Sequence, residues 1–263
     1  MIIVVSDVHL GYAKSNAGAF YRFLDQCGTL NDLDQLIFLG DILDFWRTKD
    51  AEIIEDGLYA NILNRLASVE SKKIRYVIGN HDYNMQKYLE KSKCRVPFEV
   101  SKNIRLNYDG EKYFFTHGYE LDVLANLKHF NVQEYERFSE LMCLNNDFTG
   151  TLATKAWDWL NSHKASGKFH LLKMPPEERE IIDEIHDFAL NLEKYMFLER
   201  KPDEMLVYGH THRPYISNDG TVANTGSWVD ESSGGIAKSP QNRYLKIEDG
   251  RMELRAFEVD PFP

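Results

Sequence analysis

Cysteine is scarce in this chain of 263 residues, and no apolar run approaches the length that a membrane span needs. The three cysteines, Cys27, Cys94 and Cys143, lie far apart and form no CxxC pair. This pattern argues against a disulfide framework or a zinc ribbon and favours a reducing compartment. The first residues carry neither a basic segment nor a cleavage site, so we expect a cytoplasmic protein, with the membrane periphery as an alternative.

Positive charge is also in deficit. The chain has 31 Lys and Arg against 41 Asp and Glu, a formal net charge of −10. Such a surface repels DNA, so nucleic-acid binding through the bulk field is not expected, although a local positive site stays open. Hydrophobic residues make up 43% and charged residues 27% of the chain, which excludes a wholly disordered or collagen-like protein.

The sequence has no internal repeats or low-complexity stretches. It does have five short apolar runs. Each run ends in glycine or in a polar residue, and the runs cover residues 2–5, 36–40, 74–79, 113–118 and 205–210. Runs of this kind are typical of strands buried on both faces. The spacing of apolar residues predicts helices at 17–27 and 52–69. Strands that alternate with helices indicate layered α/β packing.

The alternation stops between His117 and His210. Helical spacing occurs at 133–145 and 151–160, and a third helix is predicted from Pro175 to about Glu199. We therefore expect one domain over residues 1–263, interrupted by a helical lid at about 120–202. After the lid, Asp219-Gly220 and Asp249-Gly250 predict hairpin turns.

Five short clusters of chemically active residues stand at the ends of predicted strands. They are Asp7-Val8-His9, Gly40-Asp41, residues 79–82 (GNHD), His117-Gly118 and residues 209–212 (GHTH). Sites in open α/β sheets form at the carboxyl ends of strands. In extended backbone, residues two apart point the same way, so Asp7 and His9 would face one site, as would His210 and His212.

The types of the candidate ligands indicate a metal centre. Asp, Asn and His without Cys suit Mn²⁺, Fe²⁺ or Zn²⁺. There are more of these residues than one ion needs, and they fit two ions that share a bridging carboxylate. Two such ions clamp the attacking and leaving oxygens of an in-line phosphoryl displacement.

In this order, the motifs DVH, GD, GNHD, HG and GHTH resemble those of the calcineurin-like metallophosphoesterases. The resemblance implies a four-layer αββα sandwich, which refines the plain α/β prediction. It implies one metal on Asp7, His9, Asp41 and His212, and a second on Asp41, Asn80, His117 and His210. It further implies that His81 is not a ligand but faces the scissile phosphate, with Asp82 orienting it.

Longer segments are similar to the UDP-2,3-diacylglucosamine hydrolases, which cleave a pyrophosphate in a lipid-linked nucleotide sugar. The segments are GDILDFW (40–46), HGYELD (117–122), GHTHRP (209–214) and NTGSW (224–228). Those enzymes commonly carry Arg at the position of His81, and this departure leaves the lipid-nucleotide substrate open.

The resemblance implies a hydrolase of phosphodiester or pyrophosphate bonds. A metal-bridging hydroxide would attack phosphorus in line, with two divalent ions as cofactors, Mn²⁺ first and Fe²⁺ or Zn²⁺ as alternatives. The partner would be a phosphorylated small molecule or a lipid-nucleotide. Two other functions stay open: a phosphomonoesterase or protein phosphatase, and a non-catalytic binding module with this fold. The sequence leaves the oligomeric state open.

Several residues around the clusters have two interpretations. Arg213 would touch a phosphate oxygen or pair with an acidic neighbour. Lys164, Lys168 and Lys173 lie in a stretch without acidic residues and would hold an anionic substrate group or form solvated surface. Asp44 is an outer-sphere carboxylate or a helix cap, and Trp46 and Trp228 are pocket walls or core.

Overall fold

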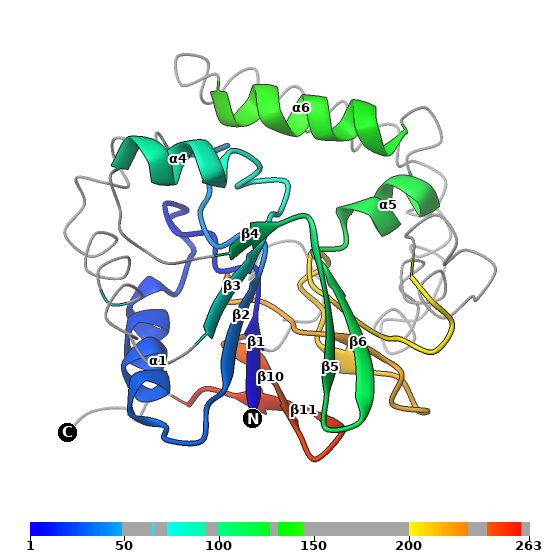
Figure 1. Cartoon of the computed structure of the whole chain (residues 1–263). Coiled ribbons are helices and arrows are strands. Elements are labelled where there is room, and N and C mark those ends of the chain that lie inside the picture. The colour runs from blue at the N-terminus through cyan, green and yellow to red at the C-terminus, as the bar shows by residue number, and fades with distance from the viewer. Residues whose placement is uncertain are drawn as a thin grey trace, which may run out of the picture.

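Two β-sheets packed face to face form the centre of the protein (Figure 1). The computed structural model describes residues 1–48, 65, 73–92, 99–126, 131–144, 200–230 and 241–258. The predicted α/β sandwich is confirmed, because helices cover the outer faces of both sheets.

The first sheet has six strands in the order β11-β10-β1-β2-β3-β4. They are β1 (Ile2–Val5), β2 (Gln35–Leu39), β3 (Lys73–Val77), β4 (Glu99–Ser101), β10 (Arg243–Glu248) and β11 (Arg251–Ala256). Strands β1 to β4 run parallel, whereas β10 lies antiparallel to β1. The carboxyl ends of β1, β2 and β3 therefore meet at one edge.

The second sheet has five strands in the order β5-β6-β7-β9-β8. They are β5 (Asn103–Tyr108), β6 (Glu111–Thr116), β7 (Met205–Tyr208), β8 (Tyr215–Ile216) and β9 (Val222–Asn224). Strands β6 and β7 are parallel neighbours, so residues on either side of the predicted lid leave the sheet at the same end.

Side chains of β1 alternate between the two faces of its sheet and so pack in two separate hydrophobic clusters. Ile2 and Val4 pack between the sheets, and Ile3 and Val5 face the helix α1 (Ala17–Thr29). This helix confirms the prediction for residues 17–27. Trp228 is fully buried in the same cluster, which decides for the core interpretation of that residue.

The glycine turns behave as their sequence predicts. Asp249-Gly250 joins β10 to β11 with φ values of 51° and 70°, the left-handed pair that a tight hairpin needs. Asp219-Gly220 lies in the turn between the antiparallel strands β8 and β9. A third turn of this kind, Asp109-Gly110 between β5 and β6, was not predicted.

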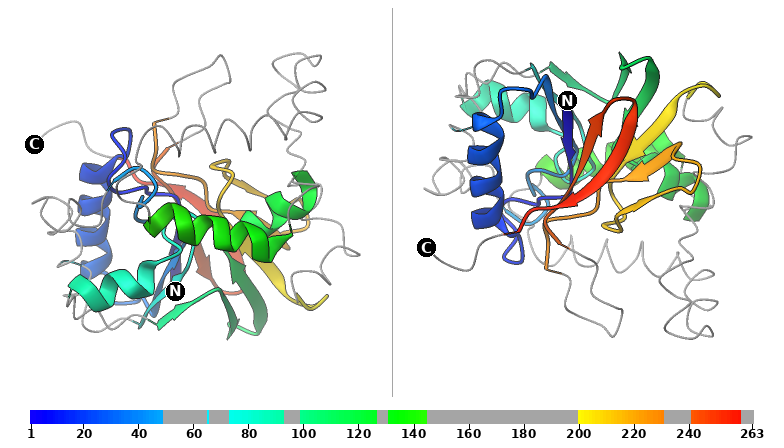
Figure 2. Two further views of the ribbon diagram at one scale, coloured as in Figure 1. Left: turned by 90° about the horizontal axis from the view of Figure 1, so that it is seen from above. Right: turned by 90° about the horizontal axis from the view of Figure 1, so that it is seen from below.

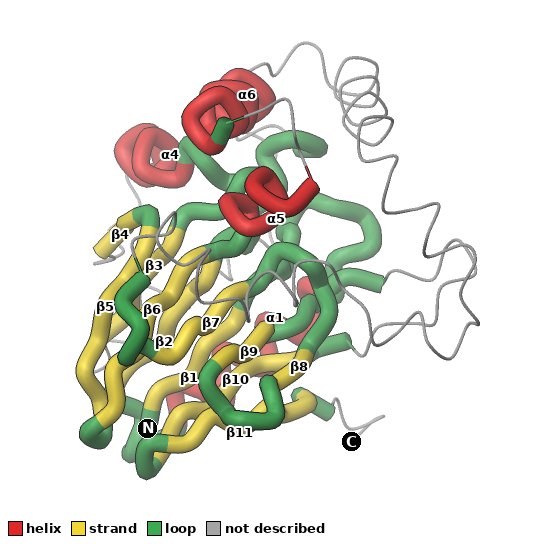
Figure 3. The backbone as a smooth tube through the Cα atoms, turned by 90° about the vertical axis from the view of Figure 1, so that its right-hand side faces the viewer, coloured by secondary structure: helices red, strands yellow, loops and turns green. Residues whose placement is uncertain are grey.

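Three further helices of the described residues lie above one end of the sandwich (Figures 2 and 3). They are α4 (Met85–Ser92), α5 (Tyr119–Asn126) and α6 (Val132–Leu144). Helix α6 confirms the helix predicted at 133–145. Among the described helices, none combines the length and apolar character that crossing a bilayer requires.

Parts of the predicted lid lie outside the described residues. This applies to the helices predicted at 151–160 and 175–199, to nearly all of 52–69, and to Lys164, Lys168 and Lys173. The extent of the lid and its place in a single domain stay predictions, and α5 and α6 are its described helices.

Candidate metal centre

The loops that follow five strands bring the predicted ligands to one end of the sandwich. Strand β1 leads to Asp7 and His9, β2 to Asp41, β3 to Asn80 and His81, β6 to His117, and β7 to His210 and His212. Three sets have potential ligand atoms within 4.8 Å of one another. The first is Asp7, His9 and His212, the second is Asp41, His117 and His210, and the third is His9, Asp41 and His81. Asn80 joins the second set, with Oδ1 3.1 Å from His210 Nδ1.

Left-handed backbone places most of these side chains. The φ angles are 54° at Asp7, 51° at His9, 54° at Asp41, 67° at His210 and 61° at His212. This conformation costs a residue with a side chain about 1–2 kcal/mol, and such strain gathers at functional sites. Asp7 and His9 do lie in one set, whereas His210 and His212 lie in different sets. The extended backbone from which both pairs were predicted was wrong, because all four residues have left-handed backbone.

Three glycines let the loops pack directly onto the ligands. A Cβ atom at Gly79 would lie 2.1 Å from Asp41 Oδ1, and one at Gly40 would lie 2.4 Å from His117 Nδ1. A Cβ atom at Gly209 would lie 2.5 Å from Asp7 Oδ2. The two carboxylates and His117 are therefore held by neighbouring backbone on which no side chain fits.

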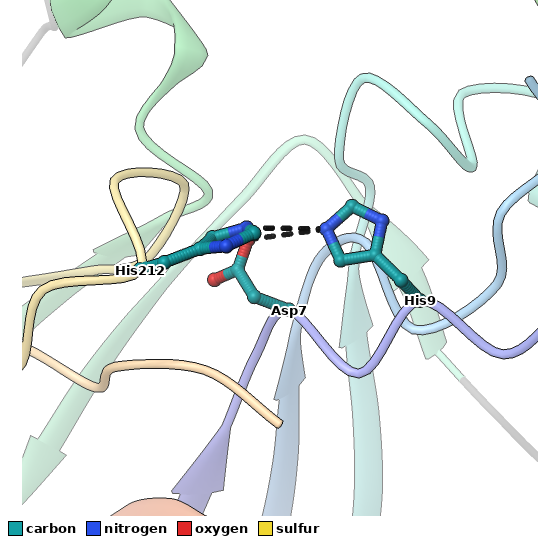
Figure 4. Close-up of side chains that lie close together, drawn as sticks. All are labelled: Asp7, His9 and His212. Atoms are coloured by element: carbon teal, nitrogen blue, oxygen red, sulfur yellow. Dashed lines mark hydrogen bonds and ion pairs between the residues drawn. The ribbon is translucent and has the colours of Figure 1, made fainter. Parts of the chain in front are cut away.

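In the first set, ring nitrogens and a carboxylate converge (Figure 4). His212 Nε2 lies 3.3 Å from Asp7 Oδ1 and 3.2 Å from His9 Nε2. His9 Nδ1 is 3.1 Å from Asp44 Oδ2. Because a carboxylate only accepts, His9 donates from Nδ1 and presents the lone pair of Nε2 to the set.

In the second set, as in the first, each histidine directs one ring nitrogen to an acceptor outside the set and the other toward the set. His117 donates from Nδ1 to the carbonyl oxygen of Leu39 at 2.8 Å, and its Nε2 lies 3.2 Å from Asp41 Oδ2. His210 Nε2 lies 3.2 Å from Asp122 Oδ2. The other nitrogen of His210 therefore faces the oxygen of Asn80.

These contacts fit bound cations. Lone pairs that face each other at 3.1–3.3 Å repel unless a proton or a cation lies between them. Asp7 Oδ1 and His117 Nε2 are buried and make no hydrogen bond within the described part of the chain. Nitrogen and oxygen donors without sulfur suit Mn²⁺, Fe²⁺ or Zn²⁺.

The charges of the site depend on one another. Burial opposes ionisation of Asp41, but His117 and His81 outweigh it and lower the pKa of this carboxyl far below its usual range. Burial likewise opposes protonation of His117, yet the charge of Asp41 raises its pKa to about 10. A proton thus balances Asp41 in the metal-free chain, and a divalent cation would replace it.

Asp44, not Asp82, contacts the ring of His81. The distance from His81 Nδ1 to Asp44 Oδ1 is 3.1 Å, and the backbone nitrogen of His81 donates to Asp41 Oδ1 at 2.8 Å. The carboxylate of Asp82 accepts from the backbone nitrogens of Gly79 and Ile42 and from the hydroxyl of Tyr76. Asp82 therefore fixes the loops, which corrects its predicted role as the residue that orients His81.

Asp44 also accepts from the backbone nitrogen of Arg47 at 3.2 Å and so caps the turn at residues 45–47, whereas the next predicted helix lies almost wholly outside the described residues. Its role as an outer-sphere carboxylate stays a prediction. Trp46 is buried and stacks on the His81 ring with centroids 4.1 Å apart, and Phe138 of α6 lies edge-on to it at 5.7 Å. Helix α6 thus reaches the His81 loop through Trp46, so Trp46 is core that backs the site.

Sequence reasoning missed two residues near the ligands. Arg47 donates to Asp44, lies over the Tyr12 ring at 4.3 Å and comes within 3.5 Å of His81 Nδ1. Asp122 is the acidic neighbour of His210, and its only sequence signal was its place in HGYELD. Arg213 follows His212 directly, and its contact with phosphate stays a prediction.

Comparison with known proteins gives consistent matches. A family model described as calcineurin-like phosphoesterase matches residues 1–214, which includes all five clusters. A UDP-2,3-diacylglucosamine hydrolase from Shewanella sp. (strain W3-18-1) is 27% identical over 256 residues, covering 93% of this chain and 95% of that protein. One from Psychromonas ingrahamii is 24% identical over 213 residues and covers 80% of each. An archaeal phosphodiesterase structure aligns at 13% identity over 97% of this chain and 98% of that chain, with a TM-score of 0.43.

Because Gly79 lies so close to Asp41, we predict that a methyl group added at Gly79 lowers both stability and metal affinity. Gly79→Ala should lower the free energy of unfolding by about 1–3 kcal/mol and weaken metal binding, because Asp41 must move. Gly18→Ala is the matched control, since a Cβ atom in α1 meets nothing within 4 Å. That control should gain about 0.5–1 kcal/mol. Urea unfolding measures both, and equal effects would contradict the assigned packing.

Asp41 lies at the junction of the two sets, so its replacement should affect two ions. We expect the wild-type chain to bind two Mn²⁺ ions and Asp41→Asn to bind both more weakly, since the variant keeps the backbone but loses the charge. Metal analysis after dialysis measures the stoichiometry. The control Asp203→Asn changes an exposed carboxylate that pairs with Lys112. One ion in the wild type, or unchanged binding by Asp41→Asn, would refute the shared ligand.

Proposed function

The chain belongs to the calcineurin-like phosphoesterase family, and we propose that it hydrolyses a phosphodiester or pyrophosphate bond with two divalent cations. Family membership and the hydrolase names of its relatives support a phosphoester hydrolase. The observation that carries the proposal is the convergence of buried ring nitrogens and carboxylate oxygens, two of which make no hydrogen bond within the described residues.

Two cations, Mn²⁺ in the first place, would supply positive charge to a bound phosphate and lower the pKa of a water molecule toward neutrality. The chain itself provides the ligands. The proposed ligands of one cation are Asp7, His9, Asp41 and His212, and those of the other are Asp41, Asn80, His117 and His210. Metal ligation by these residues is part of the proposal.

His81 is the proposed catalytic residue. Its Nδ1 is hydrogen-bonded to Asp44, and within the described residues its Nε2 makes no hydrogen bond. Nε2 is therefore the nitrogen that can contact a substrate. From there it would protonate the leaving oxygen or donate to a phosphoryl oxygen. The stack on Trp46 and the backbone bond to Asp41 hold the ring in place.

The substrate that we propose is a diester or anhydride in a nucleotide-like or lipid-nucleotide molecule. This rests on the relatives named UDP-2,3-diacylglucosamine hydrolase, which match this chain over most of its length. Arg47 beside His81 supplies a cation next to the position where those enzymes commonly carry Arg. A cytoplasmic or membrane-peripheral location belongs to the same proposal.

A non-catalytic binding module is the competing function. Proteins that keep a fold and lose its activity lose site residues, whereas every expected ligand position is filled here. A phosphomonoesterase is the competing reaction. With Mn²⁺, we expect turnover of bis-p-nitrophenyl phosphate to exceed that of p-nitrophenyl phosphate and to stop with a chelator. Faster monoester turnover would favour the phosphomonoesterase, and no turnover of either would favour the binding module.

Removal of the proposed general acid should separate catalysis from metal binding. His81→Ala should keep both metals and lose about 10²–10⁴-fold in kcat, the usual contribution of a general acid or base. His81 also lies within 4.8 Å of His9 and Asp41, so metal analysis of the variant decides between catalysis and ligation. Loss of a metal would assign His81 as a ligand. Glu253→Gln on exposed β11 is the control.

Arg47 should act on substrate binding. Its side chain is 39% exposed and anchored by Asp44, which leaves guanidinium donors for a phosphate oxygen. Arg47→Gln should lower kcat/KM for a diester by about 10- to 100-fold, mostly through KM, as expected for a lost charged hydrogen bond. Arg47→Lys should recover part of it. A pure kcat effect with unchanged KM would argue that Arg47 acts through Asp44 and His81 instead.

A further inference from the structure

Helix α5 places a carboxylate against a proposed metal ligand. The helix begins directly after His117-Gly118 and carries Asp122, which is 4% exposed. Asp122 Oδ2 lies 3.2 Å from His210 Nε2, and the opposite nitrogen, Nδ1, lies 3.1 Å from Asn80 Oδ1. Asp122 is thus behind the ring of His210, on the side away from Asn80.

This position selects one form of the imidazole ring. A neutral histidine has one nitrogen that donates and one that accepts. A carboxylate at Nε2 requires a proton there, which leaves Nδ1 with the lone pair that a cation needs. The opposite form would point a proton at Asn80 and would have to lose it before His210 could bind a metal.

Two other candidate ligand histidines, His9 and His117, have an acceptor behind the ring and are fixed in the same way. Asp44 accepts from His9, and the carbonyl oxygen of Leu39 accepts from His117. Both acceptors come from β2 or from the loop that follows it. Only for His210, among these three, does the acceptor come from a helix at the start of the predicted lid.

The packing of α5 fixes the position of Asp122. Its neighbour Leu121 is fully buried against Phe114 and Tyr208 of the second sheet. Its other neighbour, Val123, packs against Tyr135 of α6. Helix α6 and the sheet therefore hold the turn that carries Asp122 from two sides.

We propose that Asp122 is a positioning residue that sets the tautomer and the orientation of His210, so that the lid helices contribute to the second cation site. This inference rests on the proposed function for the identity of the ligand, but not for the tautomer. Residues behind metal-bound histidines typically account for about 10- to 100-fold in metal affinity or activity.

The experiment compares Asp122→Ala, Asp122→Asn and wild type after removal of metals. Calorimetric titration with Mn²⁺ should show one of the two sites weakened about 10- to 100-fold in the Ala variant. The other site should keep its affinity. The Asn variant should fall between, because its amide oxygen accepts without a charge. Glu120→Gln is the matched control: it removes a carboxylate of the same helix that binds Thr116 and Gly118 rather than His210.

A second readout does not depend on metal. Nitrogen NMR of ¹⁵N-histidine-labelled, metal-free protein reports which ring nitrogen carries the proton, under conditions where His210 is neutral. We expect the proton on Nε2 in the wild type and Glu120→Gln, and a shift toward Nδ1 in Asp122→Ala. If the Ala variant fails to fold, the Asn variant must still show the partial loss at one site.

The outcomes separate the two proposals. A wild-type chain that binds no pair of cations would overturn the proposed function, whereas an Nε2 proton that depends on Asp122 would still support the positioning role. An unchanged tautomer with unchanged affinities in Asp122→Ala would overturn that role. Equal weakening of both sites would do the same, because it would indicate a general loss of structure.

Discussion

The buried charge of Asp41 is the interaction on which the architecture of this end of the molecule depends. Its Oδ2 lies 3.2 Å from His117 Nε2, and its Oδ1 accepts a hydrogen bond from the backbone nitrogen of His81 at 2.8 Å. Loops from both sheets must therefore close around one carboxylate. Side-chain-free backbone at Gly79 and left-handed turns at the ligands are what such close approach requires. The two-sheet sandwich serves this arrangement by delivering parallel strand ends from both sheets to the same place.

Divalent cations at the proposed site would make the acidic chain compatible with an anionic substrate, because they would reverse the sign of the local charge. Carboxylates that are buried among histidines stay ionised, as the lowered pKa values of Asp7, Asp41 and Asp44 indicate. In each case burial opposes ionisation and neighbouring histidines outweigh it. Bound divalent cations would leave such a site positive inside a chain with a net charge of −10. Net charge alone argues against a nonspecific polyanion partner but says nothing of a single phosphate.

Patterns within short sequence segments were enough to predict individual strands, helices and turns. The buried strands, helix α1 and the Asp249-Gly250 turn follow from hydrophobic alternation and from glycine conformation. The place of the ligands also follows, since each cluster ends a strand. Contacts between different loops do not follow. Asp82 is next to His81 in sequence, yet Asp44, from another loop, lies at its ring. Asp122 and Arg47 were missed for the same reason: no spacing encodes a contact between segments that meet only in the folded chain.

The left-handed turns also limit which residues could replace the candidate ligands during evolution. At Asp7 and Asp41 the backbone excludes β-branched residues on steric grounds, quite apart from their chemistry. Asparagine and glycine tolerate this conformation, so they are the replacements that a lineage could accept at those two positions without rebuilding the loops. A descendant that abandoned catalysis but kept the sandwich should therefore carry Asn or Gly there. The backbone would preserve the loop geometry of the candidate metal centre after its carboxylates had been replaced.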